Sequence, residues 1–200
     1  MEGPKIHLSA TELELATNAE IILTKNRIIQ KTIALFESIQ NHITDPIKTG
    51  ALPEVFSRVG PKISKGENYR GLPYVVLDYP RLANQGNLCF IRTMFWWGHF
   101  FSSTLQLSGV YKEQALEQVR FFYQNLAREN YYIGIHTDPW QHHFEESNYR
   151  PIGLLSPKAF AAVLQEQPHI KIAAKWPLEQ WDSAAISLTN SWKLLAGLIA

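Results

Sequence analysis

The predicted fold is decided by residues 72–109, which read LPYVVLDYPRLANQGNLCFIRTMFWWGHFFSSTLQLSG. This stretch contains three apolar runs, 73–79, 88–97 and 100–108, that are rich in the aromatic and β-branched residues typical of strands. In the last run, Phe101, Leu105 and Leu107 alternate with polar residues, which is the period expected of a strand with one face on a core. The stretch therefore predicts the antiparallel centre of a sheet.

Gly98 and His99 separate the second run from the third. Gly98 can adopt positive φ at no steric cost, so Gly98-His99 predicts a type II′ hairpin turn that pairs Trp97 with Phe100. In this register, residues 90, 92, 94 and 96 share a face with residues 101, 103, 105 and 107. The alternative is one long strand bent at Gly98, which would place His99 on the apolar face beside Phe101.

Arg92 falls among apolar neighbours in the predicted hairpin and needs a partner, because an unpaired buried charge is costly. Asp78, in the neighbouring run, is the nearest candidate, and a buried Asp78–Arg92 pair that fixes strand register is the first interpretation. The second interpretation is a binding site at one end of the sheet for a small polar or anionic ligand, with two tryptophans as an aromatic wall. Its residues would be Asp78, Arg81, Arg92, Trp96, Trp97 and His99.

The length, the composition and the net charge of the chain limit the classes of protein to which it can belong. The chain has 200 residues, 46% of them hydrophobic, and a formal net charge of +1. This length and composition fit one domain, and the charge argues against a nucleic-acid or membrane-surface partner. Cys89 is the only cysteine, and neither a signal peptide nor a bilayer-length apolar stretch is found. We therefore expect a soluble, cytoplasmic protein.

Segment 9–45 predicts a helical region before the sheet. Ser9 and Glu12 have the spacing of a capping box. Apolar residues then recur at seven-residue spacing, which predicts one or two amphipathic helices ending before Pro46: Leu15, Ile22, Ile29, Phe36 and Ile43. We expect this region to pack on the sheet, with homodimerisation through the N-terminal helix as the alternative. Residues 60–71 are interpreted as a surface loop.

The remaining segments complete an α+β prediction. Helical spacing covers residues 110–129, and the C-terminal α/β section, 131–200, contains strands at 131–135 and 169–174. It also contains a helix starting at Ser156-Pro157 and a last helix over 182–199. We predict a single α+β domain over residues 1–200, with a central, mainly antiparallel sheet built on the 72–109 meander and packed by helices.

A histidine-rich segment, 136–146, carries three histidines and three carboxylates. His136, Asp138 and His142 are candidate ligands of a divalent metal, because imidazole and carboxylate suit Zn, Fe or Mn. His136-x-Asp138 resembles only the near half of the two-His-one-carboxylate triad of non-haem iron oxygenases, whose remaining histidine lies on a jelly-roll barrel that this sequence does not predict. The alternative is a polar loop anchored by Trp140.

Two function classes follow from these patterns. The first is a non-enzymatic binding or interaction module for a small polar or anionic ligand. The second is a metal-dependent hydrolase or oxygenase in which a metal-bound water is the nucleophile. A serine hydrolase is not favoured, because the sequence lacks a Gly-x-Ser-x-Gly elbow.

Overall fold

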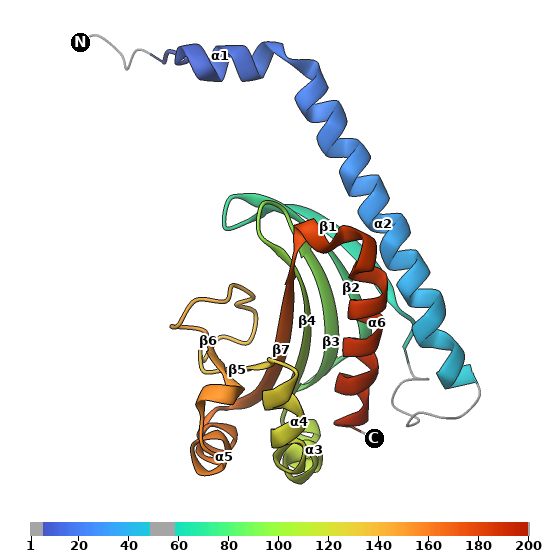
Figure 1. The fold of residues 1–200 in the computed structure, drawn as a ribbon, viewed down its shortest axis with the longest axis vertical. Coiled ribbons are helices and arrows are strands. Elements are labelled where there is room, and N and C mark those ends of the chain that lie inside the picture. Colours follow the sequence, from blue (N-terminus) through green and yellow to red (C-terminus); the bar gives the residue numbers. More distant parts are fainter. Residues whose placement is uncertain (1–5, 49–58, 200) are drawn as a thin grey trace.

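The computed structural model describes residues 6–48 and 59–199. Its centre is a seven-stranded antiparallel sheet with the order β1-β2-β3-β4-β7-β5-β6 (Figure 1). The strands are β1 Lys62–Tyr69, β2 Leu72–Asn84, β3 Asn87–Trp96, β4 Phe100–Ser108, β5 Tyr132–Gly134, β6 Tyr149–Pro151 and β7 His169–Pro177. The predicted α+β class and the antiparallel meander are confirmed. That the chain forms one domain stays a prediction.

Helices surround this sheet, and all but the exposed first one contribute buried side chains to the core. They are α1 Ala10–Thr17, α2 Ala19–Lys48, α3 Val110–Phe121, α4 Tyr123–Arg128, α5 Pro157–Glu166 and α6 Trp181–Gly197, with short 3₁₀ turns at Ile152–Leu154 and Leu178–Gln180. Figure 1 shows α2 and α6 on one side of the sheet and the connection between β5 and β6 on the other. Within the two described ranges, no helix combines the length and the apolar character needed to cross a membrane.

The sheet has two chemically different faces. On the face that α2 and α6 cover, Ile91 and Phe95 of β3 join the main core together with Phe36 of α2 and Trp192 of α6. The opposite face carries a small cluster around Met94 and a set of buried polar groups: Asp78, Ser102, Thr104, Gln106 and Lys171. We call this second face the polar face.

The predicted hairpin register is wrong by one residue. Trp96 pairs with Phe100, and Trp97, Gly98 and His99 form the turn, with Gly98 at a φ of 70°. A one-residue shift moves every side chain of one strand to the other face. In the observed register, Phe101 and Phe95 meet on the core side, and Arg92 lies opposite Thr104 on the polar face instead of inside the apolar core.

Four further boundaries differ from the sequence prediction. Residues 62–69, predicted as loop, form β1, an edge strand in which the Tyr74 ring lies against Gly66, 2.5 Å from the position of an added Cβ. Strand β6, which was not predicted, follows the histidine-rich segment. Helix α2 continues to Lys48 instead of ending before Pro46, and the helix predicted over 110–129 is interrupted at Phe122.

Candidate functional site

Two residues of the predicted ligand site, Asp78 and Arg92, meet one predicted metal ligand, His142, on the polar face. Asp78 and Arg92 are direct cross-strand partners, and Arg92 Nε and Nη2 donate to the two Asp78 carboxylate oxygens at 2.7 and 2.8 Å. The predicted Asp78–Arg92 pair is thereby confirmed. Arg92 Nη1 lies 3.1 Å from His142 Nε2, so one guanidinium joins the sheet to the histidine-rich segment. This bidentate geometry is the strongest form of an Arg–carboxylate contact.

The histidine-rich segment belongs to the covering loop, residues 135–148, which is held on the polar face by hydrogen bonds. The Asp138 carboxylate accepts the backbone N–H of Trp140 at 2.9 Å, which fixes a local turn. The Tyr69 hydroxyl accepts the backbone N–H groups of His142 and His143 at 2.6 and 3.2 Å. The loop therefore has a defined conformation against strand β1.

A buried lysine lies beneath the covering loop. Lys171 is 1% exposed, its ammonium donates to the Gln141 carbonyl oxygen, and it lies 4.9 Å from the centroid of the Tyr149 ring. Burial lowers the pKa of Lys171 to about 7. Burial also lowers the pKa of His142 and brings the pKa of His169 to about 4. The two histidines are therefore neutral near pH 7, which reduces the cost of burying them, whereas Lys171 changes its charge near that pH.

The burial of Lys171 was not predicted, because the neighbouring residues in the sequence indicate that its side chain is exposed. Ile170 and Ile172 alternate with it, so the pattern predicts a strand with Lys171 facing water. Both faces of β7 are in fact covered from His169 to Ala174. No signal within the strand itself predicts the covering loop, which comes from a segment some thirty residues earlier in the chain.

The other predicted ligand-binding residues do not join this cluster. Trp96 lies at the turn end of the polar face and stacks on His99, with ring centroids 3.6 Å apart. Trp97 lies on the opposite face, where its ring meets Phe95 edge-on at 6.2 Å. Arg81 is exposed and follows an irregularity in β2. The two tryptophans therefore do not form one aromatic wall around Arg92.

The candidate metal ligands are engaged in other contacts. His136 Nδ1 accepts the backbone N–H of Asp138 at 2.9 Å, while His142 Nε2 faces Arg92. Across residues 6–48 and 59–199, no group of three or more His, Cys, Asp or Glu side chains is arranged to hold a metal ion. Within the described residues, His136, Asp138 and His142 therefore do not form the metal site that a metal-dependent enzyme would need.

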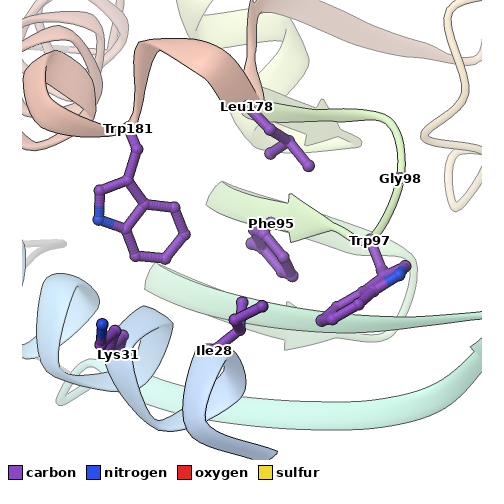
Figure 2. Close-up of a pocket in the computed structure, with 7 residues that line it drawn as sticks. All are labelled: Ile28, Lys31, Phe95, Trp97, Gly98, Leu178 and Trp181. Atoms are coloured by element: carbon purple, nitrogen blue, oxygen red, sulfur yellow. The ribbon is translucent and has the colours of Figure 1, made fainter. Parts of the chain in front are cut away.

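An open apolar cavity lies on the helix-covered face, at the turn end of the β3–β4 hairpin. Its volume is about 410 Å³. The residues that line it come from α2, the hairpin, the 3₁₀ turn before α6 and the first residue of α6 (Figure 2): Ile28, Lys31, Phe95, Trp97, Gly98, Leu178 and Trp181. Of the predicted ligand-binding residues, Trp97 lines this cavity. We call it the aromatic cavity.

The aromatic cavity could not be found in the sequence because its residues are far apart in the chain. Ile28 and Trp181 are separated by most of the sequence and meet only because α2 and α6 cover the same face of the sheet (Figure 1). The Trp181 ring lies 6.2 Å from that of Phe95, so the cavity wall is continuous with the main core. A core that supports the wall keeps such a site largely preformed.

Comparison with known proteins adds no relative. No family model, curated protein or solved structure matches this chain at a significant level. Two sites can carry a function, the buried polar cluster under the covering loop and the open aromatic cavity.

Proposed function

We propose that this protein is a binding module that holds a small amphiphilic molecule, with an apolar or aromatic body and an anionic group, in the aromatic cavity. The observation that carries the proposal is the lining: Phe95, Trp97 and Trp181 surround an opening that has Lys31 as its charged member. The volume of about 410 Å³ lies within the roughly 300–1,000 Å³ typical of small-molecule sites.

The apolar lining would supply most of the binding free energy. Ile28 and Leu178 are half-buried, and the rings of Trp97 and Trp181 are also only partly covered by the protein. Their remaining apolar surface would be removed from water by a ligand, which is worth about 25 cal/mol for each Å² buried. Aromatic side chains also offer flat surfaces on which a ligand ring can stack.

Lys31 would supply the preference for an anion. Its exposed position on α2 lets the ammonium reach a carboxylate or sulfonate at the mouth of the cavity. An exposed ion pair is worth only about 0–1 kcal/mol, so the charge would orient and select a ligand that the apolar wall holds. An anionic ligand was also expected from the sequence, but at Arg92. Because Arg92 is already paired with Asp78, we propose that the ligand is bound at Lys31 instead.

A matched pair of fluorescent probes tests this proposal. The dye 1-anilinonaphthalene-8-sulfonate is an aromatic anion, and N-phenyl-1-naphthylamine has the same ring system without the sulfonate. Both should bind, with enhanced emission, and Leu178→Trp should abolish both signals because the new indole fills the cavity. Lys31→Ala should weaken the sulfonate about threefold to fivefold and leave the neutral probe unchanged.

The control is Lys158→Ala, which removes an exposed lysine from α5 at the opposite end of the molecule (Figure 1). It should change neither affinity. Unchanged binding in Leu178→Trp would place the probes elsewhere and contradict the proposed site. Equal weakening of both probes in Lys31→Ala would contradict the role of the charge.

A further inference from the structure

A groove continues from the aromatic cavity along the first turns of α2. Its volume is about 350 Å³, and the residues that line it come from α2, from the residue before α2 and from the β3–β4 turn. Ile28 and Trp97 line both the groove and the aromatic cavity, so the two meet at these residues. The space open to a ligand is therefore longer than the aromatic cavity alone.

Residues of the groove and of the cavity form one stripe along α2. Ile21, Thr24, Ile28 and Lys31 follow one another at intervals of three or four residues, which places them on one face of the helix. Ile21 and Thr24 line the groove alone, whereas Lys31 lines the cavity alone. Figure 2 shows Lys31 and Ile28 on successive turns of α2. From Lys31 to Ile21 the helix spans about 15 Å, at about 1.5 Å for each residue.

The groove is mostly apolar and carries no net charge. Its two charged residues, Glu20 and Lys25, have opposite signs. Glu20 is paired with Arg27, and Lys25 is paired with Glu67. A charged ligand group in the groove would lose water without gaining a free partner, which is unfavourable. The groove therefore suits an uncharged, apolar part of a ligand.

The other end of the stripe has the opposite character. Lys31 is exposed at the aromatic cavity, and no carboxylate in residues 6–48 and 59–199 forms an ion pair with it. An available ammonium at one end and an uncharged apolar groove at the other complement a molecule with one anionic head and one apolar tail.

We propose that the ligand is a single-chain alkyl carboxylate whose head lies at Lys31, whose chain crosses the aromatic cavity and whose tail lies in the groove. This inference rests on the proposed function, because the head and the first part of the chain occupy the aromatic cavity. Carbon–carbon bonds of about 1.5 Å advance an extended chain by roughly 1.3 Å each, so about twelve carbons reach from Lys31 to Ile21.

Two acids of different length separate the groove from the cavity. From a carboxylate at Lys31, the chain of octanoate ends near Lys25, and that of dodecanoate ends near Ile21. The four additional methylenes then lie against Thr24 and Ile21, which line the groove and not the cavity. Full burial strengthens binding about fourfold for each methylene, and half burial in an open groove about twofold. Dodecanoate should therefore bind about sixteenfold more tightly than octanoate.

Isothermal titration calorimetry below the micelle concentration of each acid measures this ratio. In Thr24→Trp, the new indole fills the groove, and the ratio should fall below about fourfold while the octanoate affinity stays the same. Ile21→Glu is a second groove variant at a position that is 40% exposed, so the fold tolerates it, and its carboxylate should disfavour the tail. The matched control is Thr11→Trp, at an exposed threonine of α1 that lines neither the groove nor the cavity, and it should keep the wild-type ratio.

Equal affinities of the two acids for the wild type would overturn the proposal. A ratio that stays near the wild-type value in both groove variants would also overturn it, because the tail would then lie elsewhere on the surface.

The fluorescent probes separate this failure from failure of the proposed function. If Leu178→Trp abolishes probe binding but the acids show no gain with chain length, the cavity binds a compact ligand and only the alkyl-chain proposal fails. If Leu178→Trp changes neither the probe signals nor the octanoate affinity, the cavity is not the binding site and both proposals fail.

Discussion

Removal of the Asp78 carboxylate is the sharpest test of the polar face. The Asp78 and Arg92 side chains are 10% and 20% exposed, and two hydrogen bonds of 2.7 and 2.8 Å join them. In Asp78→Ala, the Arg92 guanidinium stays mostly buried beside His142 without its counter-charge. Breaking a buried pair in this way costs about 3–5 kcal/mol. Because water reaches part of Arg92, we expect the lower end, about 3 kcal/mol of unfolding free energy.

A double replacement separates the cost of the unpaired charge from the value of the pair. Asp78→Leu/Arg92→Met removes both charged groups and keeps side-chain volume on the face. It should lie within about 1 kcal/mol of wild type, because apolar replacement of a buried pair is often neutral. The surface pair Glu117–Arg120, with side chains 79% and 46% exposed, provides the control. Arg120→Ala should cost less than about 1 kcal/mol.

Urea unfolding followed by far-ultraviolet circular dichroism gives these free energies, provided that the slope with urea stays constant among the variants. A loss below about 1 kcal/mol in Asp78→Ala would show that the Arg92 charge is not buried as described. A double variant as unstable as Asp78→Ala would show that the loss comes from packing, and the electrostatic argument would be refuted.

Three further predictions follow from buried contacts. The pKa of Lys171 is about 7 in the fold and about 10.4 in an unfolded chain, so the unfolded state binds more protons between these values. Unfolding free energy should therefore rise by about 2–3 kcal/mol from pH 7 to pH 9 in urea titrations, and Lys171→Met should remove the rise. Gly134→Ala should cost about 1–3 kcal/mol, because its Cβ would lie 2.8 Å from Lys171 Cβ, whereas Gly153→Ala, with its nearest atom at 3.4 Å, should be nearly neutral in the same assay. Trp192→Phe should lower the melting temperature and cost about 1–3 kcal/mol, because the indole N–H donates to the buried Tyr79 carbonyl at 2.6 Å; no change in melting temperature would contradict that role.

The sheet could largely be predicted because its central strands carry strong patterns. Strands β2, β3 and β4 fall on the three apolar runs. Asp78 and Arg92 are charged residues within two neighbouring apolar runs, and for this reason they could be predicted to pair. The turn at Gly98 could not be fixed to one residue, since glycine permits two-residue and three-residue hairpins alike. In the observed three-residue turn, Phe95 and Phe101 pair directly and pack together on the core side of the sheet.

The edges and the sites were harder to predict than the centre. Strand β1 is half exposed, and lysine and glycine residues, common on edges that must not pair with other chains, give it the composition of a loop. The covering loop has polar residues that predict exposure, yet His142 and His143 are buried because the loop folds back on the sheet. The aromatic cavity forms only because α2 and α6 cover the same face of the sheet, and no local sequence pattern predicts that arrangement.

The place of β7 in the sheet has a consequence for biosynthesis. Strand β4 lies between β3 and β7, although the ribosome makes β7 about sixty residues later. Until then the backbone of β4 presents an open edge to other nascent chains, and the β5–β6 hairpin has no β7 to join. The run Ser102, Ser103 and Thr104 lowers the hydrophobicity of that strand at its middle. The hydroxyl groups that are buried in the finished sheet would therefore make the unfinished edge less apolar during translation.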